Sequence, residues 1–350
     1  MNRDAIVGCI LGTAVGDALG LPYEGVSPKR AVRLLGKPDR YRFVFRRGMI
    51  SDDTEHTCMV AQSLIDSKCH VDRFTRRFAG RLRWWILALP AGVGKATAKS
   101  GVKLWLGASP EKSGVFSAGN GPAMRAAIFG AVFEDEVQML EFVRASTRMT
   151  HRDPKAEYGA IAVALAAKHS RDHESVNANL WLDDVVATMG NDGDELIDLL
   201  RSAIKSVGEQ QTTSEFAMSL GLQRGVTGYT YHTVPIVIHA WLSHPRDFRS
   251  AVMSMIECGG DADTTAAIVG GIVGTGVGAS EIPDEWMKGL WEYPRSVRWM
   301  QELGCALAES MSSDVIKRAP TVNPIAVVIR NVMFLLVVLF HGFRRLAPPY

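Results

Sequence analysis

Two short acidic clusters stand about two hundred residues apart in the sequence. They are Ser51-Asp52-Asp53-Thr54 and Asp261-Ala262-Asp263-Thr264-Thr265. Each cluster places two carboxylates and at least one hydroxyl directly ahead of an apolar helical pattern. One such cluster favours an ordinary helix cap, because Ser, Thr and Asp are the preferred capping residues. Two of them exceed what capping requires, since adjacent carboxylates repel each other unless a cation or hydrogen bonds compensate.

Oxygen donors without His or Cys are typical of a site for hard divalent cations. Such donors suit Mg²⁺, Mn²⁺ or Ca²⁺ and do not suit zinc or copper. The spacing of Asp261 and Asp263 is not that of an EF-hand loop, because the remaining ligands and the closing Glu are missing. Two cations held by both clusters could orient a water molecule and bind oxygens of a phosphate- or ribose-bearing substrate. We therefore predict that the two helix starts meet, so that Asp53 and Asp263 hold the same cations.

The elements that must position these clusters are predicted to be helices. Residues 156–169 and 264–277 form Ala-rich apolar stretches that are too long for buried strands. Residues 137–147 and 194–207 carry apolar side chains at helical spacing with charges between them. A short segment at 41–45 is the one candidate strand. The expectation is a compact, all-α single domain over residues 1–310.

Two helical segments contain glycine at every fourth position. Their glycines are Gly8, Gly12, Gly16 and Gly20 in the first, and Gly270, Gly274 and Gly278 in the second. Residues four apart share a helix face, so each stripe lets a neighbouring backbone approach closely. Glycine costs a helix up to about 1 kcal/mol relative to alanine, which indicates a packing requirement. Asp17 inside the first stripe favours a close-packed soluble core over a pair of membrane helices.

Composition excludes some classes of function and location. The chain has 39 basic and 37 acidic residues and a formal charge of +2, without the basic face of a nucleic-acid-binding protein. Its five cysteines show no CxxC spacing, which predicts free buried thiols in a reducing compartment. The N-terminus does not have the pattern of a signal peptide. These features predict a cytoplasmic protein.

The tail, residues 311–350, differs from the rest of the chain. Its apolar runs at 325–329 and 332–340 are interrupted by Arg330-Asn331 and followed by Arg344-Arg345. A membrane-spanning helix needs about 20 apolar residues, and these runs are shorter and contain a charge. Two interpretations stay open: a last helix packed on the domain or on a partner, and a peripheral membrane anchor with basic flanks.

Five segments, taken together, resemble the ADP-ribosylglycohydrolase family. They are residues 12–24 (GTAVGDALGLPYE), 51–54 (SDDT), 119–125 (GNGPAMR), 150–156 (THRDPKA) and 259–274 (GGDADTTAAIVGGIVG). They occur in the family's order and, with the two glycine stripes, span residues 8 to about 278. The resemblance implies an all-α fold with a dinuclear Mg²⁺ or Mn²⁺ centre in a cleft. It also implies hydrolysis of the bond between ADP-ribose and an acceptor.

The resemblance also implies roles for individual residues. The metal ligands would be Ser51, Asp52, Asp53, Asp261, Asp263 and Thr264. Glu24 or Asp53 would be the catalytic carboxylate, and the substrate would lie against Gly119, Asn120, Gly121 and His151. Ser51 stands where threonine is frequent but keeps the hydroxyl. Ala262 stands between the aspartates, where a threonine or another small residue is usual.

Some of these residues also have an ordinary structural interpretation. A lone histidine such as His151 is more often a capping or core residue than a ligand, and Asn120 between two glycines could be a turn residue. Arg125 could equally be a structural ion-pair partner or a phosphate contact.

Three functions therefore stay in view from the sequence. The first is removal of ADP-ribose from a modified protein or small molecule, and the second is hydrolysis of a different free ADP-ribosyl compound. The third is a non-catalytic structural or interaction protein of the same fold. The paired carboxylates argue against the third, because a structural role needs no mutually repelling charges. The acceptor is not determined by any pattern in the sequence.

Overall fold

A computed structural model describes residues 2–68, 70–312, 318–344 and 346, so Cys69 and Arg345 lie outside the described residues. The all-α prediction is confirmed: the described chain consists of helices and loops, with only isolated β-bridges between loops. The candidate strand at 41–45 is wrong. That segment has no partner strand and ends in a 3₁₀ turn at Val44–Arg46.

The helices follow one another with short connections. In chain order they are α1 (Arg3–Gly20), α2 (Pro28–Leu35), α3 (Asp52–Ser67), α4 (Val71–Leu87), α5 (Lys95–Trp105), α6 (Pro110–Ser113), α7 (Ala127–Val132), α8 (Glu136–Thr150), α9 (Pro154–Asp172), α10 (Ala178–Met189), α11 (Asp194–Gly208), α12 (Thr213–Ser219), α13 (Thr230–Ser243), α14 (Phe248–Glu257), α15 (Ala262–Val277), α16 (Asp284–Gly289), α17 (Val297–Ser312) and α18 (Pro324–Arg344). Further 3₁₀ turns lie at Leu21–Tyr23, Ala123–Arg125, Gly190–Gly193 and Ala279–Glu281. The helices predicted at 137–147, 156–169, 194–207 and 264–277 are confirmed as parts of α8, α9, α11 and α15.

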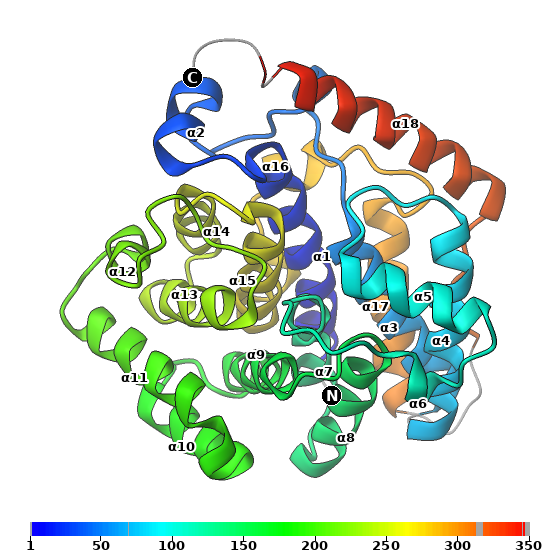
Figure 1. Cartoon of the computed structure of the whole chain (residues 1–350), viewed down its shortest axis with the longest axis horizontal. Coiled ribbons are helices and arrows are strands. Elements are labelled where there is room, and N and C mark those ends of the chain that lie inside the picture. The colour runs from blue at the N-terminus through cyan, green and yellow to red at the C-terminus, as the bar shows by residue number, and fades with distance from the viewer. Residues whose placement is uncertain (1, 69, 313–317, 345, 347–350) are drawn as a thin grey trace.

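The two glycine stripes pack against each other at the centre of the molecule. A Cβ added at Gly12 would lie 2.2 Å from the carbonyl oxygen of Gly270, and one at Gly16 would lie 2.1 Å from that of Ala266. Both distances are far inside van der Waals contact, so α1 and α15 approach backbone to backbone, as Figure 1 shows at the middle of the fold. Gly278 lies just past the end of α15, with a φ of 82°. The prediction of a close-packed core is confirmed.

This central pair positions the starts of the two helices that carry the acidic clusters. A Cβ at Gly20, the last residue of α1, would lie 2.3 Å from the carbonyl oxygen of Ala262, the first residue of α15. The end of α1 therefore lies against the start of α15. Because α3 also packs against α1, the starts of α3 and α15 are brought to the same end of the central pair.

Among the described residues, two helices are long and apolar enough to cross a membrane by length and composition. The first is α1, whose apolar window is entirely buried in the protein. The second is α18, whose window is only 28% buried. Figure 1 shows α18 lying along the outside of the helical body, where Phe334 packs with Leu21 and Phe43. Of the described cysteines, Cys9, Cys58 and Cys258 are buried free thiols and Cys305 is partly buried.

Candidate metal centre and cleft

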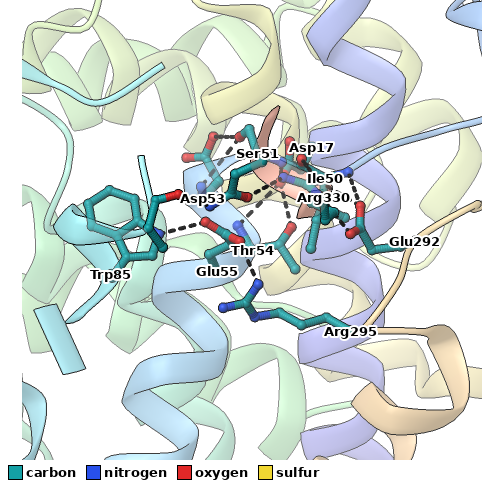
Figure 2. Close-up of polar contacts among 12 residues, drawn as sticks. Asp17, Ile50, Ser51, Asp53, Thr54, Glu55, Trp85, Glu292, Arg295 and Arg330 are labelled. Atoms are coloured by element: carbon teal, nitrogen blue, oxygen red, sulfur yellow. Dashed lines mark hydrogen bonds and ion pairs between the residues drawn. The ribbon is translucent and has the colours of Figure 1, made fainter. Parts of the chain in front are cut away.

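Asp17 of α1 holds the first turn of α3. Its Oδ2 accepts hydrogen bonds from the backbone N–H of Ser51 at 2.8 Å and of Thr54 at 3.2 Å, and from the Thr54 hydroxyl (Figure 2). Sequence reasoning did not assign Asp17 to the site. The available signal was its position: it is the one charged residue between Ala5 and Gly20 in a helix otherwise made of apolar residues, glycines and a threonine.

The structure brings the two acidic clusters into contact. Oδ2 of Asp53 accepts one hydrogen bond from the Ser51 hydroxyl at 3.0 Å and another from the Thr264 hydroxyl at 3.3 Å. Asp53 and Thr264 are 211 positions apart in the chain. The start of α3 and the start of α15 therefore meet, with their acidic side chains on a common side.

Helix capping accounts for only part of this arrangement. Ser51 does cap α3, because its side chain accepts from the backbone N–H of Asp53. Asp261 precedes α15 but makes no capping bond to it. Its Oδ2 instead accepts from Nδ2 of Asn120 at 2.6 Å, and the same amide lies 2.9 Å from the hydroxyl of Thr233. Asn120 thus ties its loop to the acidic cluster and is more than a turn residue.

The carboxylates raise one another's pKa. Burial, and then the negative charge of neighbouring carboxylates, raises the pKa of Asp52, Asp53 and Asp263 well above the ordinary value. Burial also raises the pKa of Asp261. It raises the pKa of Asp17 to about 6, although the hydrogen bonds that Asp17 accepts from Thr54 and Ser51 act to lower it. The cluster is therefore costly to ionise without a compensating positive charge.

In the part of the chain that the structure describes, three buried carboxylate oxygens have no hydrogen-bond donor: Oδ1 of Asp17, Oδ1 of Asp53 and Oδ1 of Asp263. Buried polar atoms are normally paired, and a carboxylate left without a partner is expensive. Within the described residues, no three His, Cys, Asp or Glu side chains already form a ligand set. Oδ2 of Asp53 and Oδ2 of Asp261 are instead bonded to hydroxyl and amide groups. Oxygen donors of this kind fit a hard divalent cation.

A second group of residues shapes the wall formed by the Gly119–Gly121 loop. A Cβ at Gly119 or at Gly121 would lie 3.1 Å from the ring of His151, so the two glycines leave room for that side chain. Burial, and then the charge of Arg125, lowers the pKa of His151 to about 3. His151 is therefore neutral at physiological pH.

Arg125 is a structural residue. It is fully buried, and its guanidinium donates to the Gly121 carbonyl at 2.8 Å and to the Thr150 hydroxyl at 2.7 Å. The Thr150 hydroxyl in turn lies 2.9 Å from Nδ1 of His151. Arg125 thus holds both the glycine loop and the histidine in place. Its role is structural, but the hydrogen-bond partners that the structure describes for it are hydroxyls, backbone carbonyls and a histidine rather than the carboxylate of an ion pair.

These residues surround a cleft with a volume of about 670 Å³. The sequence-predicted residues that line it are Glu24, Ser51, Asp52, Gly119, Asn120, Gly121, His151, Asp261, Asp263 and Thr264. Asp53 lies behind this wall, buried and bonded to Ser51 and Thr264. Glu24 is exposed to solvent within the cleft.

The cleft also contains residues that the sequence did not single out. The start of α5 lines it with Gly94, Lys95 and Thr97, and Arg224 lies on another wall. A glycine-rich turn leading to Lys and Thr at a helix start is a signal for anion binding, and it was available at residues 92–97. Phe334 and Val338 of α18 line the cleft as well, and no local pattern indicates this.

Comparison with known proteins gives relatives along most of the chain. A protein from Archaeoglobus fulgidus described as uncharacterized is 31% identical, covering 86% of this chain and 95% of its own. The ADP-ribosyl-[dinitrogen reductase] glycohydrolase of Rhodospirillum rubrum is 25% identical, covering 87% and 97%. Human ADP-ribosylhydrolase ARH3 is 26% identical, covering 82% and 89%.

A solved structure and a family model agree with these relatives. The chain resembles a solved "ADP-ribosylglycohydrolase-related protein complex" with a TM-score of 0.62 and 24% identity, covering 88% of this chain and 98% of that one. At that identity the likeness shows the fold. The model of the ADP-ribosylglycohydrolase family matches residues 1–317. The chain therefore belongs to the ADP-ribosylglycohydrolase family and is a hydrolase of that family.

Proposed function

We propose that the chain hydrolyses the glycosidic bond between ADP-ribose and a modified acceptor, with two divalent cations, Mg²⁺ or Mn²⁺, bound between α3 and α15. The observation that carries the proposal is the contact of the two acidic clusters around three buried, unpaired carboxylate oxygens. The names of the Rhodospirillum rubrum and human relatives support ADP-ribosyl groups as the substrate class.

The cations would be held by the side chains that meet at this point. The candidate ligands are Ser51, Asp52, Asp53, Asp261, Asp263 and Thr264, and the unpaired Oδ1 of Asp17 adds one more oxygen beside them. When bound, the cations would orient the substrate and lower the pKa of a bound water. They would also offset the repulsion that raises the pKa of these carboxylates.

The protein's own residues would position the sugar and handle the proton. Glu24 is the better candidate for general base, because it is exposed in the cleft whereas Asp53 is buried and already accepts two hydroxyl hydrogen bonds. Neutral His151 and the Gly119–Gly121 loop would form the wall against which the substrate lies. Carboxylates near the sugar stabilise the positive charge that develops as a glycosidic bond breaks.

Two exposed cationic side chains in the cleft suit the charge of a diphosphate. They are Lys95, at the first position of α5, and Arg224. The first turn of α5 carries no acidic residue, so its N–H groups and helix dipole favour an anion. A nucleoside diphosphate linked to ribose would thus find positive side chains and a helix N-terminus in the same cleft as the carboxylates.

The test is release of ADP-ribose from arginine-modified peptides, serine-modified peptides and a free ADP-ribosyl compound. We expect release from at least one of them, its loss in chelator, and its return with Mg²⁺ or Mn²⁺. Asp263→Asn should abolish both release and metal binding, whereas Asp183→Asn, on the exposed side of α10, should change neither. Full activity in chelator would contradict the metal centre, and no release from any substrate would contradict the proposed reaction.

A cytoplasmic location, and a division into a 1–310 domain and a 311–350 tail, stay predictions from the sequence.

A further inference from the structure

Helix α18 presents apolar side chains to solvent and polar side chains to the protein. Arg330, Asn331 and His341 are its buried polar residues. Its outward side chains are at least 45% exposed at Ile325, Ile329, Val332, Met333, Leu336, Leu339, Phe340 and Phe343. This is the reverse of an ordinary surface helix, whose charged face is turned to water.

The polar residues fix the helix in this orientation. Arg330 donates to both carboxylate oxygens of Glu292, at 2.8 and 2.7 Å, and to the carbonyl of Ile50 at 2.6 Å (Figure 2). Asn331 donates to the carbonyl of Ala88 at 2.8 Å, on the same side of the helix. Turning the apolar face inward would break these bonds and leave buried charges unpaired, which costs several kcal/mol.

The same bonds argue against a membrane-spanning orientation. The helix has 21 residues and a mean hydropathy of 2.2, which meets the length and composition of a span. Spanning would move Arg330 away from Glu292 and into hydrocarbon, where a charged side chain is costly. A helix that lies flat, with its polar residues on the protein and its apolar face outward, keeps every one of these contacts.

The apolar surface continues beyond the helix. A groove of about 390 Å³ lies between α18 and the loops that carry Phe45, Trp291 and Tyr293. These three aromatic side chains are 80%, 62% and 68% exposed. Trp and Tyr are enriched where proteins meet the boundary between lipid headgroups and hydrocarbon. Contiguous exposed apolar side chains of this kind mark sites that contact a protein partner or a membrane.

Positive charge gathers at the C-terminal end of this surface. Arg42, Arg46 and Arg344 line one pocket of about 420 Å³ together with Phe45 and Phe340. Arg42 is paired with Asp39 at 3.0 Å, while Arg46 and Arg344 are exposed. None of the described residues that line the pocket is acidic, and α18 contains no acidic residue. Apolar residues beside exposed arginines match the chemistry of an anionic phospholipid surface, which offers hydrocarbon and phosphate together.

We infer that the outward face of α18, together with Phe45, Trp291 and Tyr293, docks on an anionic membrane surface. Arg46 and Arg344 contact the lipid phosphates. Pairing of α18 with the α18 of a second copy fits this surface less well, because that helix has no acidic residue to meet the arginines. Since Phe334 and Val338 on the inner side of α18 line the cleft, docking holds the cleft next to the membrane.

Flotation with lipid vesicles tests the docking surface on the full chain. We expect the protein to bind vesicles of phosphatidylcholine with phosphatidylglycerol more tightly than vesicles of phosphatidylcholine alone. The double variant Leu336→Glu with Phe340→Glu should lose about tenfold or more in vesicle binding, because it places two charges in the docking face. The matched control is Val137→Glu, an exposed apolar residue on α8, which should bind as the unchanged protein does.

The arginines and the alternative partner need separate measurements. Arg46→Gln with Arg344→Gln should remove the preference for phosphatidylglycerol and the sensitivity of binding to salt. Circular dichroism melting checks that each variant is folded. No binding of the unchanged protein to either vesicle would overturn the inference. It would also be overturned by a dimer in solution that Leu336→Glu with Phe340→Glu dissociates while vesicle binding is unaffected. Equal binding to both vesicles would overturn the role of the arginines.

Discussion

At the scale of single residues, Asp17 does two things with two oxygens. Oδ2 satisfies the backbone at the start of α3, and Oδ1 is buried without a partner beside the acidic clusters. For the first role, a neutral hydrogen-bond acceptor serves as well as a charged one. For the second role, the negative charge matters if a cation binds at the site. Substitutions of different kinds can therefore separate the two roles.

We predict that Asp17→Asn weakens binding of Mn²⁺ about tenfold or more and leaves the metal-free protein within about 1 kcal/mol of its original stability. The amide oxygen can still accept from Ser51 and Thr54, but the charge is gone. Asp17→Ala should instead destabilise the metal-free protein by about 2 to 3 kcal/mol, since three buried donors lose their acceptor. Titration with Mn²⁺ and urea unfolding in chelator measure the two effects. Equal metal affinity in Asp17→Asn and the unchanged protein would remove Asp17 from the centre.

At the scale of elements, the glycines of α1 and α15 set the distance between the helices that carry the site. Alanine is a better helix former than glycine by about 1 kcal/mol, so conformational preference alone would favour substitution. Packing opposes it, because a Cβ at Gly12 would lie 2.2 Å from a backbone oxygen that has no freedom to move. Helix preference would stabilise the alanine variant and packing would destabilise it. At a Cβ–oxygen distance of 2.2 Å the packing effect is the larger.

We predict that Gly12→Ala lowers the free energy of unfolding by about 2 kcal/mol or more. It should also weaken metal binding, because moving α1 away from α15 separates Asp17 from Asp263. Gly80 in α4 is the matched control: nothing lies within 4 Å of a Cβ added there, so Gly80→Ala should be neutral or stabilising by up to about 1 kcal/mol. Thermal unfolding of both variants gives the comparison. If the two substitutions had the same effect, close packing of the stripes would not be their role.

A second prediction at this scale concerns the attachment of α18. Arg330 bonds to Glu292 and to the carbonyl of Ile50, the residue before Ser51, so the helix supports the start of the first cluster. Arg330→Met should cost about 3 to 5 kcal/mol, because it leaves the buried carboxylate of Glu292 without its cation. Adding Glu292→Gln should restore a large part of the loss. Urea unfolding measures both variants, and additive losses in the double variant would show that the two residues do not act as a pair.

At the scale of the whole molecule, the sequence predicted the fold class and the residues of the acidic clusters. The type and spacing of the acidic residues are local features of the sequence, and the periodicity of apolar residues that indicates helices extends over long stretches of it. Asp17 was missed because its function depends on a backbone turn 34 positions away. The contribution of α5 was missed because the sequence does not say toward which cleft the glycine-rich turn before this helix points. That is visible only in the three-dimensional structure. The orientation of α18 could not be predicted, because it depends on the bonds of Arg330 to Glu292 and Ile50. Those residues are distant in the chain and meet α18 only in the folded protein.

The same tertiary burial makes the whole protein sensitive to acid through its neutral histidines. Burial, and then the charge of His244, lowers the pKa of His239 to about 4, and its ring contacts the hydroxyls of Ser206 and Thr213 inside the fold. In the unfolded chain the pKa returns to the ordinary value of about 6.5. Between those two values the unfolded state binds the proton and the folded state does not. His239 therefore costs stability as the pH falls below about 6.5, by up to about 1.4 kcal/mol per pH unit.

We predict that His239→Gln makes the free energy of unfolding depend less steeply on pH between pH 6.5 and pH 5. The slope should fall by up to about 1.4 kcal/mol per pH unit, which corresponds to the uptake of about one proton. Glutamine keeps donors and acceptors near the two hydroxyls and has no charge to gain. The exposed His70 is the matched control, and His70→Gln should leave the slope unchanged. Urea unfolding at several pH values in chelator measures the slopes, and the raised pKa values of the acidic clusters cancel because all three proteins share them. An unchanged slope in His239→Gln would mean that His239 is protonated in the folded protein, and its packing against Phe216 would then need another explanation.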